Sequence, residues 1–182
     1  MKKRRFFALF LVLGLLVSLL SVPASAFEEI DVDARAALLV EKETGEILYE
    51  KNAHEKNYPA SITKLTVALL VFEAIDAGQL SLDQPITAHE SAFEGLSIYG
   101  STAGIKAGEV LTVEQLLQCM LIVSANEACN ILAEAVCGEG NISQFVQRMN
   151  ERVAALGCEN THYVNTSGLH DSAHYTTAWD IY

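Results

Sequence analysis

One third of the way along the chain, the sequence reads Tyr58-Pro59-Ala60-Ser61-Ile62-Thr63-Lys64-Leu65-Thr66. From residue 62 to residue 77 apolar side chains recur at helical spacing, which predicts a helix closed by Gly78. Ser61 and Lys64 lie three residues apart at the start of this helix, so their side chains share one face within contact distance.

This pair combines a nucleophile with a base. A serine hydroxyl attacks poorly unless a neighbouring group accepts its proton. Lys64 can accept that proton if burial and the positive potential of a helix N-terminus lower its pKa. The alternative is structural, with Ser61 as a helix cap and Lys64 in solvent, as is common for Ser-x-x-Lys sequences.

A second polar element, Ser124-Ala125-Asn126, interrupts an apolar run that extends from residue 116 to residue 136. A hydroxyl and an amide are costly to bury without hydrogen-bond partners. Either they cap a helix that begins near Asn126, or they act in a site. In the second case, Ser124 relays a proton beside Lys64, and Asn126 forms a hydrogen bond with a substrate amide.

The remaining pattern predicts helices and short strands. Residues 36–40 and 47–49 form a hairpin around Gly45, and residues 81–110 form irregular surface with short strands. Thr112 caps a helical region that continues to Gly138 with a break near residues 124–126, and a further helix covers residues 143–156 before Gly157. Residues 178–182 resemble the middle of a helix.

Composition excludes several classes of protein. The 182 residues are 51% hydrophobic and 19% charged, which indicates one globular domain rather than a disordered or fibrous chain. The sequence has 12 basic and 23 acidic side chains, and a net charge of -11 argues against a nucleic-acid partner.

The first 26 residues have the pattern of a secretory signal peptide. Basic residues 2–5 precede an apolar run from Phe6 to Leu20, and Ala24-Ser25-Ala26 provides a small-residue cleavage site. The alternative is an uncleaved anchor, for which the run is short. Cleavage after Ala26 would leave 156 residues with a net charge of -15.

Four cysteines, Cys119, Cys129, Cys137 and Cys158, lack the spacing of a zinc site. Buried free thiols are favoured over disulfides, although the pattern leaves both open. His170, Asp171 and His174 have a spacing that could ligate a metal, but the small residues around them favour structural hydrogen bonding. Glu127 is expected to complement a helix N-terminus.

Three ordered segments together resemble a known family, over roughly residues 30–182. Ser61-Ile62-Thr63-Lys64 and Ser124-Ala125-Asn126 resemble the S-x-x-K and S-x-N motifs of penicillin-binding proteins and serine β-lactamases. Their neighbouring residues are similar to those of D-alanyl-D-alanine carboxypeptidases. A late stretch of the chain is also similar to these carboxypeptidases. It contains Asn165-Thr166-Ser167-Gly168-Leu169, His174-Tyr175-Thr176-Thr177-Ala178 and Asp180.

The resemblance implies an α+β fold of the β-lactamase and transpeptidase type, in which helices form a subdomain beside an antiparallel sheet. It also implies a mechanism. Ser61 attacks the D-Ala-D-Ala bond of a peptidoglycan stem peptide and forms an acyl-enzyme, with Lys64 as general base, Ser124 as proton relay and Asn126 as substrate-binding residue. β-Lactams would acylate Ser61, and neither a metal nor an organic cofactor is required.

One motif of the family is missing. The sequence contains no Lys-Thr-Gly or Lys-Ser-Gly, and its last lysine is Lys106. The expectation is therefore that residues 27–182 are an incomplete catalytic domain without its later sheet strands. Expressed alone, they would be poorly folded and show little activity, because an isolated hairpin is marginally stable.

Two other functions compete with a secreted carboxypeptidase in the cell envelope. A serine β-lactamase would need an acid positioned for deacylation, and no convincing Glu-x-x-Leu-Asn is present. A non-catalytic binding protein on the same scaffold is less economical, because all four motif residues are intact. Membrane association would depend on a C-terminal region that this chain does not include.

Overall fold

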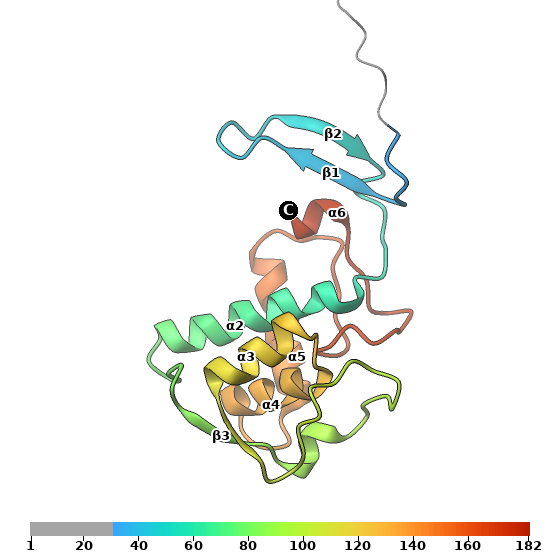
Figure 1. Ribbon diagram of the computed structural model, residues 1–182. Coiled ribbons are helices and arrows are strands. Elements are labelled where there is room, and N and C mark those ends of the chain that lie inside the picture. Colours follow the sequence, from blue (N-terminus) through green and yellow to red (C-terminus); the bar gives the residue numbers. More distant parts are fainter. Residues whose placement is uncertain (1–30) are drawn as a thin grey trace, which may run out of the picture. The chain divides into compact units, whose positions relative to one another are not determined.

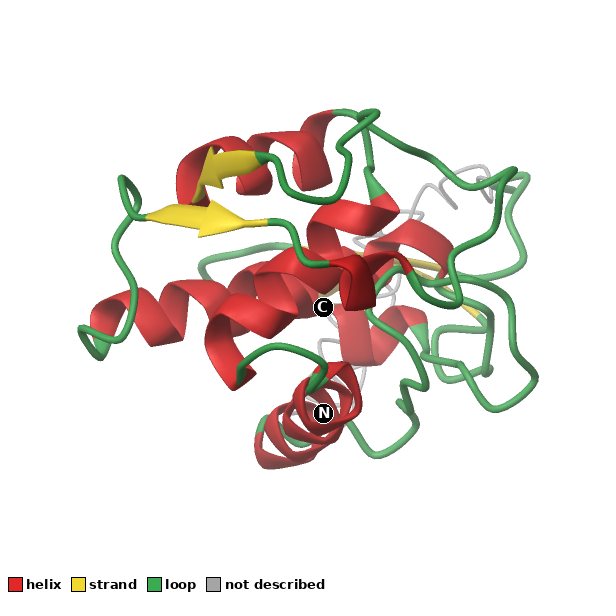
Figure 2. Ribbon diagram, turned by 90° about the horizontal axis from the view of Figure 1, so that it is seen from below, coloured by secondary structure: helices red, strands yellow, loops and turns green. Residues whose placement is uncertain are grey.

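The computed structural model describes residues 31–182, and the predicted signal peptide lies outside them. Four helices form the core: α2 (Lys64–Asp76), α3 (Val113–Ile122), α4 (Asn126–Cys137) and α5 (Ile142–Ala155). Figure 1 shows them grouped below a β-hairpin, and Figure 2 shows the same group from below.

Helix α4 is the centre of this group, because it packs against α2, α3 and α5. Every residue from 126 to 134 is buried, including two glutamates and two asparagines. A helix that is covered on all sides can keep polar groups only where they find partners, so the polar positions of α4 mark places where other segments are attached.

The predicted helix ends are confirmed. Thr112 caps α3 through a capping box with Gln115. Gly78 and Gly157 follow α2 and α5 with φ angles of +70° and +87°, the left-handed conformation that favours glycine. The break predicted near residues 124–126 separates α3 from α4.

Two antiparallel pairs of strands complete the fold. Strands β1 (Ala37–Val40) and β2 (Ile47–Lys51) form the predicted hairpin, whose turn contains Gly45 at φ +72°. Strands β3 (Pro85–Thr87) and β4 (Val110–Thr112) bracket the irregular region, which also contains the 3₁₀ turn η2 (Glu90–Phe93). Each pair forms a separate two-stranded sheet.

The segment after α5 returns to the start of α2. Asn57 and Thr176 exchange two backbone hydrogen bonds, and the Trp179 N–H donates to Ala53 O. The chain then forms the short helix α6 (Ala178–Ile181), which contacts β1. These links place the late segment beside the start of α2, although Asn57 and Thr176 lie 119 positions apart in the sequence.

All four cysteines are free thiols. The expectation that they are buried is correct for Cys129, and the other three are half-buried. Among residues 31–182, no helix combines the length and apolarity needed to cross a bilayer.

Candidate active site

Ser61 lies in the 3₁₀ turn η1 (Ala60–Thr63), which leads directly into α2. The predicted helix of residues 62–77 therefore begins with a tighter turn. Its first residue, Ala60, has a φ angle of +48°, which is rare for a residue with a side chain. Backbone strain of this kind is typical of functional sites. The turn leaves Ser61 exposed while Lys64, one turn later, points into the protein.

Lys64 is 3% exposed, and three acceptors surround its amine. Nζ lies 3.3 Å from Ser61 Oγ, 2.9 Å from Asn126 Oδ1 and 3.0 Å from Ser167 O. Burial lowers the pKa of Lys64, an effect that Cys129 and Glu127 partly oppose. The structural alternative of a solvated lysine is therefore wrong, and burial shifts the pKa of Lys64 in the direction that a base requires.

Ser124 completes a chain of hydroxyls. Its Oγ donates to Ser61 Oγ over 2.9 Å, and the Lys64 amine donates to the same oxygen over 3.3 Å. Ser124 has a φ angle of +61°, which makes it, with Ala60, one of three described residues other than glycine with a positive φ. Of these strained residues, Ala60 directly precedes Ser61 in the chain, and Ser124 forms a hydrogen bond with it.

Asn126 does not cap the helix. The N-cap of α4 is Ala125, without a side-chain hydrogen bond, so the capping alternative is wrong. Asn126 Oδ1 instead accepts from Lys64, and within the described part of the chain its Nδ2 makes no hydrogen bond. That orientation leaves an amide donor beside the nucleophile. Glu127 lies in the first turn of α4, as expected, and its Oε1 also accepts two hydrogen bonds from residues 102 and 103.

The carbonyl of Ser167 is the part of the site that the motifs did not identify. Asn165 Oδ1 accepts from the N–H groups of Ser167 and Gly168, which forms the turn that presents Ser167 O to Lys64. Gly168 has a φ angle of +84°, and a Cβ there would lie 1.8 Å from Ala60 O. In the sequence, Gly168 is the residue that could have indicated this close approach.

His174 supports this turn. Its Nδ1 accepts from the Val164 N–H over 3.1 Å, so the proton is on Nε2, which lies 2.8 Å from Thr63 Oγ1. Burial lowers the pKa of His174 to about 4. Both ring nitrogens are thus engaged in hydrogen bonds, while His170 packs edge-on against the Tyr58 ring. His174 thus makes the structural hydrogen bonds that the sequence suggested.

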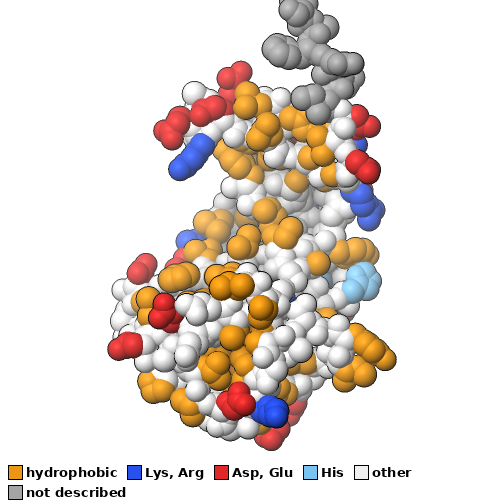
Figure 3. Space-filling view, viewed as in Figure 1, with side chains coloured by type: hydrophobic (Ala, Val, Ile, Leu, Met, Phe, Trp, Pro, Cys, Tyr) orange, Lys and Arg blue, Asp and Glu red, His pale blue; other side chains and the backbone are white. Residues whose placement is uncertain are grey.

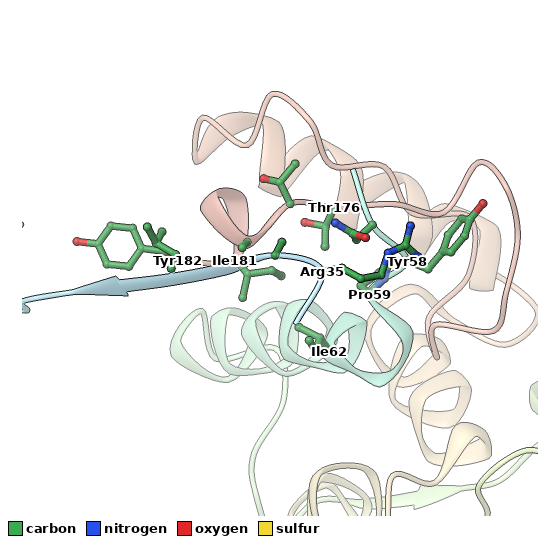
Figure 4. Close-up of a pocket in the computed structure, with 12 residues that line it drawn as sticks. Arg35, Tyr58, Pro59, Ile62, Thr176, Ile181 and Tyr182 are labelled. Carbon is green, nitrogen blue, oxygen red and sulfur yellow. The ribbon is translucent and has the colours of Figure 1, made fainter. Parts of the chain in front are cut away.

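Two cavities lie near these residues. The larger, about 540 Å³, lies between β1, η1 and α6, and none of the four motif residues lines it. Figure 4 shows its lining, with Ile62 and Ile181 coming from separate helical segments. The smaller, about 360 Å³, is bordered by Asn126, Glu127 and residues 93–105. Of the four motif residues, Asn126 borders the smaller cavity.

As a chemical arrangement, the site can activate an exposed hydroxyl and accept its proton. Ser61 has the chemistry of a nucleophile, buried Lys64 that of a base, and Ser124 that of a second carrier for the proton. Asn126 offers a hydrogen-bond donor to an incoming amide. These groups match those of acyl transfer through a serine ester.

Comparisons with known proteins were made for the whole chain. Residues 23–182 match the peptidase S11 family, described as D-alanyl-D-alanine carboxypeptidase. The chain is 35% identical over 173 residues to D-alanyl-D-alanine carboxypeptidase DacF of Bacillus subtilis, an alignment that covers 91% of this chain and 43% of the relative.

Solved structures show the same fold. The D-alanyl-D-alanine carboxypeptidase DacD from Francisella tularensis is 37% identical with a TM-score of 0.77, over 85% of this chain and 36% of that one. Penicillin-binding protein D2 from Listeria monocytogenes, in its ampicillin-bound form, is 29% identical with a TM-score of 0.71, over 85% and 61%. The chain spans about 43% of the length of its Bacillus relative. The α+β fold of the transpeptidase type is confirmed, and the chain belongs to the D-alanyl-D-alanine carboxypeptidase family.

Proposed function

We propose that this chain carries the nucleophile and base of a serine-type carboxypeptidase that removes the terminal D-alanine from peptidoglycan stem peptides. The observation that carries this proposal is the buried amine of Lys64, 3.3 Å from the exposed hydroxyl of Ser61. Membership of the family supports the substrate class.

In the acylation step, Ser61 Oγ bonds to the carbonyl carbon of the D-Ala-D-Ala peptide bond. Its proton passes to the neutral amine of Lys64, and the oxyanion is held in part by the Ser61 N–H. As the C–N bond breaks, Ser124 donates its proton to the amine of the leaving D-alanine and takes up in exchange the proton held by Lys64. Asn126 Nδ2 donates to a backbone carbonyl of the substrate.

In the second step, water attacks the Ser61 ester and releases the shortened peptide. A β-lactam would form the same ester with Ser61, and the ampicillin-bound Listeria relative supports this expectation. The proposed reaction uses no metal or organic cofactor, because a serine and a lysine supply both the nucleophile and the proton transfers.

The proposed setting is extracytoplasmic, in the cell envelope. Stem peptides lie outside the membrane, and the pattern of residues 1–26 is that of an export signal. We propose residues 27–182 as part of a catalytic domain. The low activity expected of this segment alone stays a prediction, so function is best tested in the full gene product.

The decisive experiment labels the full gene product with a fluorescent penicillin and measures D-alanine release from a peptide ending in D-Ala-D-Ala. The wild type is expected to form an adduct on Ser61, located by peptide mass spectrometry, and to release D-alanine. Ser61→Ala should lose both properties, and a peptide ending in L-Ala is the substrate control.

Three results would overturn the proposal. Rapid turnover of nitrocefin without a lasting adduct would indicate a β-lactamase. An adduct on a residue other than Ser61 would place the nucleophile elsewhere. A folded wild type that neither binds penicillin nor releases D-alanine would indicate a non-catalytic protein.

A further inference from the structure

The start of α4 is attached, residue by residue, to a loop that borders the smaller cavity. The Asn126 N–H donates to Ser101 O over 2.9 Å. Glu127 Oε1 accepts from Thr102 Oγ1 and from the Ala103 N–H, both over 2.7 Å. Three successive loop residues are thus fixed to two successive helix residues, one of which provides the amide proposed to bind substrate.

Glu127 is the charged member of this attachment and is 3% exposed. A buried carboxylate is stable only where hydrogen bonds replace its hydration, and both short bonds come from the loop. Thr102 Oγ1 also accepts from the Gly104 N–H over 2.8 Å, so the glutamate holds a loop that is itself folded into a turn.

The same loop approaches the Asn126 side chain from the other side. A Cβ added at Gly100 would lie 2.5 Å from Asn126 Nδ2. The φ angle of Gly100 is not among the positive values, so closeness rather than backbone conformation explains the glycine. The loop therefore restricts where the amide can lie, while Lys64 holds its Oδ1.

The loop also carries exposed apolar side chains beside the site. Ile98 and Tyr99 are 89% and 93% exposed, immediately before Gly100. Isolated exposed side chains are ordinary, but these two follow Ser97, whose carbonyl accepts from the Gly100 N–H in the turn. Movement of the loop would therefore change both the amide and the rim of the cavity.

We propose that Glu127 is a positioning residue for substrate binding: by holding the loop of residues 97–104 on Asn126, it fixes the amide that receives the peptide. This inference rests on the proposed function. Glu127 does not touch the reacting atoms, and it acts through the loop and its neighbour in the sequence.

The negative charge of Glu127 opposes the lowering of the Lys64 pKa. Its effect on the base can therefore be separated from its effect on the loop. The negative charge of Glu127 raises the pKa of Lys64, whereas burial lowers it more strongly. Cys129 is the other group that raises it, from the same helix. A glutamine at position 127 would keep the two acceptor bonds and remove the opposing charge.

Glu134 provides a matched control on the same helix. It is 5% exposed, and its Oε1 accepts from Ser91 Oγ over 2.6 Å and from the Gly140 N–H over 3.0 Å. Like Glu127, it attaches other segments to α4. It lies two helical turns further along, and its partners are not part of the 97–104 loop.

The experiment compares Glu127→Ala, Glu127→Gln and Glu134→Ala in the full gene product. Steady-state release of D-alanine gives kcat and KM, and fluorescent penicillin gives the acylation rate. For Glu127→Ala we expect KM to rise about tenfold with kcat changed about twofold, the scale of one lost oriented hydrogen bond. Glu127→Gln should keep KM within about twofold and shift the acidic limb of the kcat/KM profile to lower pH.

Glu134→Ala should reduce stability without raising KM. Equal KM changes in both alanine variants, or an unchanged KM in a folded Glu127→Ala protein, would overturn the inference. If Glu127→Ala does not fold, Thr102→Val takes its place, because it removes one hydrogen bond to Glu127. Its KM should also rise, and an unchanged KM in the folded variant would overturn the inference.

Hydrogen exchange separates this inference from the proposed function. Glu127→Ala should speed exchange of the Ala103 amide, which donates to the glutamate, and Glu134→Ala should not. A wild type without D-alanine release or penicillin binding overturns the proposed function and, with it, the role in binding. Unchanged Ala103 exchange in an active protein overturns only the inference.

Discussion

The helices and the β1–β2 hairpin are built on different principles. Apolar residues of α2, α3, α4 and α5 form most of the buried core, whose members all lie between Ala53 and Tyr163. Neither strand of the hairpin contributes a buried residue, and Leu39 and Leu48 are each 56% exposed. Figure 3 shows apolar side chains on the hairpin surface and along the narrow region beneath it.

This difference explains where the candidate site lies. Lys64 and Asn126 belong to α2 and α4 of the helical core, and Ser61 and Ser124 lie in the short segments that lead into these two helices, so the packing of the helices helps to fix their distances. The hairpin is held by local backbone pairing and by contacts between β1 and α6. We therefore expect substitutions in the two regions to differ greatly in effect.

The largest effect is expected in the helical core. Phe145 in α5 is fully buried, and Phe145→Ala should lower the free energy of unfolding by about 3–5 kcal/mol, through lost burial and the cavity left behind. Urea denaturation of the full gene product, followed by far-UV circular dichroism, measures this. A loss of less than about 1 kcal/mol would mean that the core around α4 is loosely packed.

The next effect depends on pH and tests how firmly the late segment is attached to α2. The folded protein keeps His174 neutral down to a pKa of about 4, whereas the unfolded chain takes up the proton near 6.5. The unfolded state therefore binds more protons between these values, and stability falls as the pH drops from 6.5 toward 4. The loss should reach up to about 3 kcal/mol.

Denaturation at pH 7, 5.5 and 4.5 checks this prediction. His174→Gln should lower stability at pH 7 and weaken the dependence on pH in this range. His54→Gln changes an exposed histidine and is the control, for which the dependence should persist. A wild type whose stability is constant between pH 7 and 4.5 contradicts the prediction.

The sequence predicted the helical part well, because its local signals agree with its packing. Gly78, Gly157 and Thr112 end or begin helices where expected, and each does so through a local interaction. The pairing of Ser61 with Lys64 follows from helical spacing, although Ser61 lies in a 3₁₀ turn and the regular helix begins at Lys64. The meeting of Ser61 with Ser124 came from the resemblance, since no local rule joins residues 63 positions apart.

Contacts made by the backbone could not be predicted in the same way. Every residue has a carbonyl, so nothing in the sequence distinguishes Ser167 O as the third acceptor for Lys64. Gly100 and Gly168 allow close approach to segments that are distant in sequence, and a glycine alone does not reveal its neighbour. The left-handed conformations of Ala60 and Ser124 contradict residue preference and are imposed by the surrounding fold.

The third prediction tests the contact between the late segment and the nucleophile turn. In Gly168→Ala the new Cβ meets Ala60 O, whereas in Gly157→Ala nothing lies within 4 Å. Both positions have a positive φ, so each should lose about 1–2 kcal/mol from backbone strain. Gly168→Ala should lose about 1–3 kcal/mol more of the free energy of unfolding than Gly157→Ala, because the backbone at Ala60 must move.

Labelling by fluorescent penicillin separates the two glycine variants further. Displacing η1 from Ser167 should slow acylation of Ser61 at least about tenfold in Gly168→Ala, since small misplacements of a nucleophile are costly. Gly157→Ala, at the end of α5, should be acylated at the wild-type rate. Equal rates in the two variants would show that the Ala60 contact does not position the nucleophile.

The smallest effect is expected in the hairpin, where it tests the contrast between the hairpin and the helical core. Leu48→Ser replaces a side chain that is 56% exposed, and it should change the free energy of unfolding by no more than about 0.5 kcal/mol. Hairpin amides should also exchange faster than those of α4. A loss of about 2 kcal/mol or more in the full gene product would mean that another part of that product covers Leu48. The hairpin would then belong to a core larger than the helical one, and the contrast between the two regions would be a property of residues 31–182 alone.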